Sequence, residues 1–183
     1  MPPPWWPRCD DRDGDGRGGG GLDGVVNAAG VARPGPIATT SPSDWQLTLD
    51  VNVRGLLHVT QAALPSLVAA ERADVVNVSS MSGRRIGSPE MAVYAASKAA
   101  VHALSEGLRR EVADDRVRVS VIAPGFVRTG ILDDQDSEAA RRLGRKGQEV
   151  GLDPRRVADR IVEMLAAPAD MVHVEVAMLS VEQ

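Results

Sequence analysis

The stretch DVVNVSSMSG, residues 74–83, sets the interpretation of this sequence. Its first five residues are rich in valine, which is typical of a buried strand, and the small polar residues after them predict a loop. A helical pattern follows over residues 93–112, and another apolar run over residues 116–122. A strand, a helix and a strand in this order predict a parallel α/β sheet, which binds ligands at the carboxyl ends of its strands.

The pattern extends toward the N-terminus. Residues 22–27 predict a strand that ends in the sequence NAAG, and residues 43–70 predict a long helix. Ser43 is expected to begin this helix as a capping box with Gln46, because a serine hydroxyl and a side-chain amide can each satisfy a free backbone N–H. Pro65 is expected to kink or interrupt it, because proline lacks that N–H.

The pattern also extends toward the C-terminus, where Pro124 and Gly125 are expected to end the strand over residues 116–122. Residues 133–144 predict a mobile polar helix or lid. Pro154 is expected to open a helix that runs to about residue 167, since proline fits the first helical turn. Alternating valines over residues 172–176 predict a last strand.

Length, charge and cysteine content exclude several classes of protein. With 183 residues, one domain is expected. The net charge of −4 and the lack of a basic stripe argue against binding to nucleic acid or to an anionic membrane surface. Cys9 is the single cysteine, so a disulfide or a cysteine-built metal site within the chain is excluded. We expect no metal, no membrane-spanning helix, and a reducing, cytoplasmic location.

Residues 1–21 differ in composition from the rest. Prolines come first, then charged residues, then a cluster of glycines at 14–21. This composition predicts a disordered segment, because it buries too little apolar surface to offset the entropy of ordering. The glycines do not fit a phosphate loop, because no apolar strand precedes them. The expected organisation is therefore a disordered segment over 1–21 and one α/β domain over 22–183.

Tyr94 and Lys98 are the strongest candidates for chemistry. They lie four residues apart on a predicted helix, so both side chains project from one face. A nearby ammonium favours a phenolate and lowers the pKa of the phenol, which would make Tyr94 a usable acid and base. Taken alone, a tyrosine and a lysine could simply share a helix surface. His102, one turn further on, is expected to be a surface residue.

Five stretches together resemble the short-chain dehydrogenase/reductase family. They are VVNAAG (25–30), DVNVRG (50–55), VNVSS (76–80), YAASK (94–98) and PGFVRT (124–129). They occur in the family's order and extend from about residue 22 to the C-terminus. The resemblance implies a Rossmann-like, doubly wound parallel sheet. The region from residue 152 to the C-terminus is similar to members that oxidise 3-hydroxy acids or serine-like substrates with NADP.

The resemblance implies roles for four residues. Tyr94 would be the general acid and base, and Lys98 would bind the nicotinamide ribose and lower the tyrosine pKa. Ser80, chosen over its neighbouring serines because it precedes Gly83 by three residues, would bind the substrate oxygen. Asn52 would hold a water beside Lys98. The implied cofactor-binding residues are Asn27, Ala28, Gly30, Tyr94, Lys98, Pro124, Gly125, Val127 and Thr129.

The sequence departs from the family at its N-terminus. The family begins with a strand, a glycine-rich phosphate loop and further strand-helix units, which precede the strand ending in NAAG. These hold the cofactor pyrophosphate and select NAD or NADP. None of them is recognisable before residue 22, so we expect the N-terminal half of the nucleotide-binding unit to be missing, as in a truncated fragment or a misread gene start.

Two hypotheses follow from the resemblance and this departure. The first is an NAD(P)-dependent oxidoreductase, with NADP slightly favoured, that transfers a hydride between nicotinamide and a small alcohol or ketone. The second is an inactive truncated fragment that acts at most as an oligomerisation or interaction module. Both agree with the homodimers or homotetramers that the resemblance implies for the full-length form.

Overall fold

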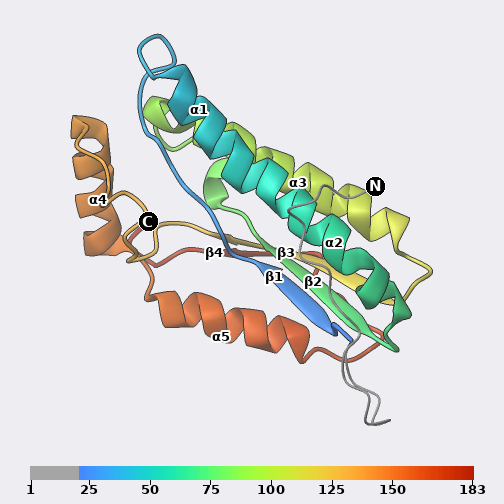
Figure 1. Ribbon diagram of the computed structural model, residues 1–183. Helices are drawn as coiled ribbons and strands as arrows, with labels where there is room; N and C mark the ends of the chain where they lie inside the picture. The colour runs from blue at the N-terminus through green and yellow to red at the C-terminus, as the bar shows by residue number, and fades with distance from the viewer. Residues whose placement is uncertain (1–20) are drawn as a thin grey trace.

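Four short runs that contain valine form one parallel sheet (Figure 1). The structure is a computed structural model, and it describes residues 21–183. The strands are β1 (Gly24–Asn27), β2 (Ala73–Val78), β3 (Val117–Pro124) and β4 (Glu175–Met178), and they are ordered β1-β2-β3-β4 in the sheet. Every neighbouring pair is parallel. All four carboxyl ends therefore meet at one edge of the sheet.

Helices cover both faces of the sheet. One face carries a continuous run made of α1 (Pro42–Leu49), a π-helical turn (Asp50–Gly55) and α2 (Leu56–Ala69), beside α3 (Ala92–Glu111). The opposite face carries α5 (Pro154–Leu165), while α4 (Glu138–Val150) lies beyond the end of the sheet (Figure 1). Two short 3-10 turns, Met81–Gly83 and Pro89–Met91, precede α3. This arrangement confirms the predicted doubly wound α/β class.

The core lies in two layers, one on each side of the sheet. Leu67 of α2 packs with Val75 and Val119 on the α2 and α3 side, and all three are buried. On the α5 side, Val76 and Ile122 pack against Met164. Every residue of β3 is buried, which explains its nearly continuous apolar sequence, because a central parallel strand is covered on both faces.

A buried ion pair closes the amino-terminal end of the sheet. The guanidinium of Arg118 donates to both carboxylate oxygens of Asp74, at 2.8 and 2.9 Å. It also donates to four main-chain carbonyls after α5, those of Leu165, Ala167, Pro168 and Met171. This pair joins β2, β3 and the end of α5 far from the polar edge, so we assign it a structural role.

The predicted boundaries near the first helix need two corrections. The N-cap is Ser41 rather than Ser43, because Pro42 occupies the first helical position and the Ser41 hydroxyl accepts from the Ser43 N–H. Pro65 does not interrupt α2, which continues to Ala69.

Near the C-terminus, two further boundaries differ from the prediction. The last strand begins at Glu175, because its register with β3 starts at the pair Val121 and Glu175. The predicted helix over residues 133–144 is instead α4, which begins after the N-cap Ser137. The predicted disordered segment falls, except for Gly21, on residues 1–20, which lie outside the described residues. None of the helices in residues 21–183 is long and apolar enough to cross a membrane.

Candidate active site

Polar side chains gather where the parallel strands end. Ser79 and Ser80 follow β2 directly and are both buried. The Ser80 hydroxyl accepts a hydrogen bond from the Ser82 N–H at 3.1 Å, which fixes the serine at the start of the Met81–Gly83 turn. In this bond the Ser80 oxygen is the acceptor, so its own hydroxyl hydrogen remains available to donate. Ser80 lies near Tyr94, and its hydroxyl acts to lower the pKa of the phenol.

Helix α3 supplies Tyr94 and Lys98 from one face, as their spacing predicts. The Lys98 Nζ atom lies 5.9 Å from the centre of the Tyr94 ring. Its ammonium donates to the Val78 carbonyl at 2.8 Å, so the lysine reaches back across the end of β2. The side chain is almost fully buried, although it carries a charge.

Asn52 joins the loop after β1 to α3. Its side chain accepts from the Val31 N–H at 2.8 Å and donates to the Val31 carbonyl at 2.9 Å. It also donates to the Ser97 hydroxyl at 2.9 Å. Asn52 lies in the π-helical turn between α1 and α2, and such turns are frequent at functional sites.

Gly30 connects Asn52 with Lys98. A Cβ atom on Gly30 would lie 3.4 Å from both the Asn52 Oδ1 and the Lys98 Nζ atom. The asparagine oxygen and the lysine nitrogen therefore approach the same point on the main chain. Asn52, Ser80, Tyr94 and Lys98 thus converge around one edge of the sheet.

Burial is the main cause of the pKa shifts of Tyr94 and Lys98 on α3. Burial raises the pKa of the Tyr94 phenol, and the hydrogen bond from Ser80 opposes this rise. Burial lowers the pKa of Lys98 to about 8. This differs from the expectation that Lys98 lowers the tyrosine pKa. The reason is geometric, since the lysine amine bonds to the Val78 carbonyl rather than to the phenol.

The residues expected to bind a cofactor lie at the same edge of the sheet, but their side chains differ in exposure. The Asn27 side-chain nitrogen donates inward to Thr60 and Asn77, so its side chain faces the helices. Ala28 and Gly30 lie in the loop after β1, where Ala28 is exposed. The remaining positions follow or end β3, namely Pro124, Gly125, Val127 and Thr129.

Three features of the site escaped the sequence interpretation. The Ser79 hydroxyl donates to the Lys98 carbonyl at 2.9 Å and so fastens the loop after β2 to α3. Gly83 lies against the main chain of Lys98, where a Cβ atom would come within 2.7 Å of the carbonyl carbon. The spacing of residues along the sequence gives no indication of such contacts. His102 was predicted to be a surface residue, which is wrong: its side chain is 18% exposed and lies 3.5 Å from Glu175.

The segment that contains α4 is tied to both sides of this edge. Arg33, in the loop after β1, forms two hydrogen bonds with the Asp134 carboxylate, at 2.8 and 3.2 Å. Arg142 of α4 donates to Glu90 at 2.8 Å. These contacts join the segment to the loop after β1 and to the turn before α3, and its role as a mobile lid stays a prediction.

Comparison with known proteins places this geometry in a family. The family model described as short chain dehydrogenase matches residues 17–140. An uncharacterized oxidoreductase of Staphylococcus aureus (strain MW2) is 35% identical over 162 residues, which are 88% of this chain and 64% of that protein. A similar oxidoreductase of Staphylococcus saprophyticus is 33% identical with the same coverage. The chain therefore spans about 64% of the length of these relatives.

Solved structures give the same result. Serine dehydrogenase from Escherichia coli superposes with a TM-score of 0.73 at 29% identity, over 88% of this chain and 65% of that one. The closed form of a serine dehydrogenase complexed with NADP+ superposes with a TM-score of 0.81 at 30% identity, over 88% and 66%. Because the family model matches more than half of its residues, the chain belongs to the short-chain dehydrogenase family.

Proposed function

We propose that this chain carries the catalytic part of an NAD(P)-dependent oxidoreductase that acts on a small alcohol or ketone. One observation carries the proposal: a hydroxyl, a phenol, an ammonium and a carboxamide converge from three separate segments on one edge of the sheet. Proton transfer requires groups within hydrogen-bond reach of the reacting oxygen, and Ser80 and Tyr94 are near enough to each other for the serine hydroxyl to lower the pKa of the phenol.

Each residue contributes a distinct step. The Ser80 hydroxyl orients the substrate oxygen beside Tyr94, because its own oxygen is fixed by the Ser82 N–H. Tyr94 holds its proton at neutral pH, since burial raises its pKa. The phenol can therefore donate a proton to the oxygen of a carbonyl substrate during its reduction. Lys98 keeps a positive charge near this oxygen over much of the physiological range.

The residues at this edge fit a nicotinamide cofactor. Gly30 leaves room where a side chain would touch both Asn52 and Lys98, so the main chain after β1 stays accessible to a ligand. Lys98 and Tyr94 would bind its ribose, and the loop with Gly125, Val127 and Thr129 would border its nicotinamide ring. When bound, the nicotinamide supplies or accepts the hydride. Either NADP or NAD is proposed, with NADP slightly favoured by the similarity to an NADP+-bound serine dehydrogenase.

A 3-hydroxy acid is the proposed substrate class. The support is the similarity to serine dehydrogenases, since serine is itself a 3-hydroxy acid. An arginine is available for a substrate carboxylate, because Arg85 follows the Ser80 loop and is exposed. A guanidinium pairs with a carboxylate through two parallel hydrogen bonds.

Hydride transfer by the 183-residue protein tests this function. With NADP+ at millimolar concentration and L-serine or 3-hydroxybutyrate, we expect slow formation of NADPH, followed by its absorbance. Tyr94→Phe keeps the ring but removes the proton, so the rate should fall by about 10² to 10⁴. Arg160→Gln, on the opposite face, should keep the parent rate. Equal rates in Tyr94→Phe and the parent would contradict the proposed role.

A further inference from the structure

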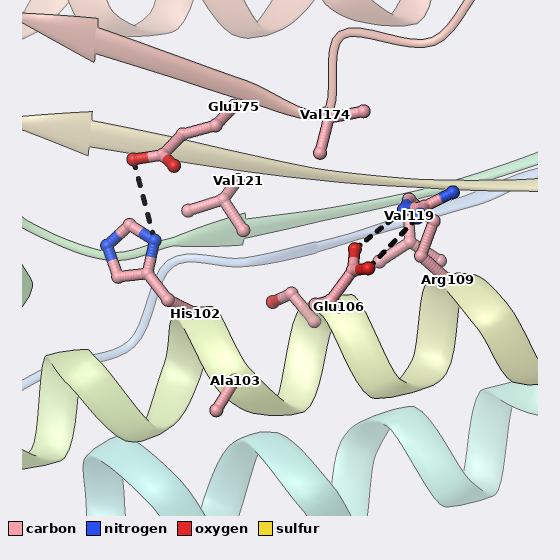
Figure 2. A pocket seen from close by; sticks show the side chains of 9 residues that line it. His102, Ala103, Glu106, Arg109, Val119, Val121, Val174 and Glu175 are labelled. Atoms are coloured by element: carbon pink, nitrogen blue, oxygen red, sulfur yellow. Dashed lines mark hydrogen bonds and ion pairs between the residues drawn. The ribbon is translucent and has the colours of Figure 1, made fainter.

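A single carboxylate connects the last strand with both halves of the site. Glu175 is the first residue of β4 and its side chain is 22% exposed. Both of its oxygens contact the guanidinium of Arg84. One of them lies 3.5 Å from His102 Nδ1, and Figure 2 shows this contact across the gap between α3 and β4.

The two partners of Glu175 belong to the two segments that carry the catalytic candidates. Arg84 directly follows the Met81–Gly83 turn, and its N–H donates to the Met81 carbonyl at 3.0 Å. The guanidinium is thus attached to the turn that Ser80 begins. His102 lies one turn after Lys98 on α3. Glu175 therefore links the loop of Ser80 to the helix of Tyr94.

On this side α3 packs against β3, but its contacts with β4 are few. Beyond His102, a cavity of about 380 Å³ separates α3 from β3 and β4. Arg109 lines it but bonds to Glu106 of its own helix, as Figure 2 shows. Within residues 21–183, the contact between His102 and Glu175 is the one contact of a basic with an acidic side chain that joins α3 to β4. The position of Glu175 itself is fixed, because β4 pairs with β3 through its main chain.

We propose that Glu175 is a positioning residue, which holds the Ser80 loop through Arg84 and thereby fixes Ser80 against Tyr94. The proposal deepens the proposed function and rests on the same catalytic pair. A carboxylate that accepts two charge-assisted bonds from one guanidinium fixes its partner in angle as well as in distance. Loss of this contact leaves Arg84 exposed and the turn held only by its own hydrogen bonds and by α3.

This arrangement makes the acidity of Tyr94 a measure of the position of Ser80. The groups near the phenol are Ser80, whose hydrogen bond lowers its pKa, and Lys98, whose amine bonds elsewhere. The groups that face Glu175 are the guanidinium of Arg84 and the imidazole of His102. If Ser80 moves away, burial acts on Tyr94 unopposed, so its pKa rises further.

The titration of Tyr94 provides the test, because it is the only tyrosine in the chain. The near-ultraviolet absorbance of tyrosinate therefore follows this one residue, without cofactor or turnover. Ser80→Ala serves as the reference for complete loss of the hydrogen bond. We expect Glu175→Gln to raise the Tyr94 pKa by at least half as much as Ser80→Ala does. Far-ultraviolet circular dichroism at each pH restricts the comparison to folded protein.

Matched variants separate positioning from a general effect. Glu106→Gln removes a carboxylate at the same cavity whose bonds are to Arg109 and Arg110 of its own helix, so the Tyr94 pKa should stay at the parent value. Arg84→Gln breaks the same link from an exposed residue and should match Glu175→Gln, even if the latter folds poorly. An unchanged Tyr94 pKa in Arg84→Gln, or no shift in Ser80→Ala, would overturn the proposal. Neither outcome depends on hydride transfer, so failure of the proposed function remains distinguishable.

Discussion

At the scale of single residues, Lys98 combines two properties that oppose each other. It is 4% exposed, yet its amine must carry a charge to assist the proposed chemistry. The Val78 carbonyl offsets part of the cost of burial by accepting its hydrogen bond. The remaining cost lowers the pKa of Lys98 to about 8. The stability of the fold therefore depends on the pH through a residue of the candidate site.

We predict that Lys98 makes the protein more stable as the pH rises from about 8 to about 10. In this window the unfolded lysine keeps its proton while the native lysine loses it, so the free energy of unfolding increases with pH. The slope from this one group reaches about 1.4 kcal/mol per pH unit. Urea unfolding should show that Lys98→Met removes this slope. Lys146→Met, which changes the other lysine of the chain, should keep it, and equal slopes in all three proteins would refute the prediction.

The sequence predicted which residues converge better than it predicted their contacts. The four-residue spacing of Tyr94 and Lys98 requires a shared helix face, so their proximity was predictable. The direction of the lysine amine was not, because it depends on the carbonyl of Val78, which is twenty residues away. The inward position of His102 likewise depends on Glu175, which lies on β4, far away along the sequence.

At the scale of elements, the loop after β2 and the helix α3 meet closely at Gly83. A Cβ atom there would lie 2.7 Å from the Lys98 carbonyl carbon and 2.8 Å from its oxygen. These are main-chain atoms of a helix and cannot move aside cheaply. The close approach is what allows Ser79 and Ser80 to reach Lys98 and Tyr94 from the preceding strand.

We expect Gly83→Ala to push the loop away from α3. The added methyl should lower the free energy of unfolding by about 1 to 3 kcal/mol, as overpacking usually does. It should also raise the Tyr94 pKa, because Ser80 moves with the loop. Gly87→Ala is the matched control, since its added Cβ would meet nothing within 4 Å. If both variants unfold at the same urea concentration as the parent, the contact at Gly83 is not tight.

Most strands and helices were predictable because their apolar periodicity is strong. The strand over β2 and the helix over α3 lie within two residues of their predicted limits. The errors fell where a boundary depends on something outside the local pattern. Ser41 caps α1 because of Pro42, and β4 begins where its register with β3 begins. The π-helical turn around Asn52 has no periodic signal at all.

At the scale of the whole molecule, α2 and α3 leave an apolar surface uncovered. Leu57 and Val59 of α2 are 42% and 49% exposed, and a hollow of about 670 Å³ runs between the two helices. The sequence predicts that apolar residues on these two helices face a partner, namely Val59, Ala62, Ala63, Ala99, Val101 and Leu104. Of these, Ala63 and Val101 instead belong to the core. The apolar surface that includes Leu57, Val59 and Leu104 is still larger than packing of the helices on the sheet can cover.

We predict that this face forms a two-fold interface between copies of the chain. An isologous contact covers the same patch on both copies and is the commonest arrangement in homo-oligomers. Sedimentation at micromolar concentration should show a dimer or tetramer, and Val59→Glu should shift it toward the monomer by placing a charge in the interface. Val162→Glu, on exposed α5, is the control that should leave the assembly unchanged. A parent protein that sediments as a clean monomer would contradict the prediction.

The free edge of β1 bears on how tightly a dinucleotide cofactor can bind. In residues 21–183, β1 pairs with β2 alone, and its Val26 is 41% exposed. In open parallel sheets the pyrophosphate of a dinucleotide is held by the N-terminus of a helix that follows a strand. The loop after β3 is the proposed nicotinamide side of such a site and the loop after β1 its proposed adenosine side, but the described residues include no glycine-rich turn from a strand into a helix.

We therefore predict that a polypeptide of the printed 183 residues binds NADPH and NADH weakly. Each charge-assisted hydrogen bond to a pyrophosphate contributes roughly 1.5 to 3 kcal/mol, so the loss of several would weaken a micromolar site to about millimolar or beyond. Isothermal titration of the purified protein with each cofactor measures this directly. Lys98→Met should weaken even the residual binding, because it removes the ribose contact, whereas Lys146→Met should not. A low micromolar Kd for either cofactor would mean that residues outside 21–183, or a second copy, complete the pyrophosphate site.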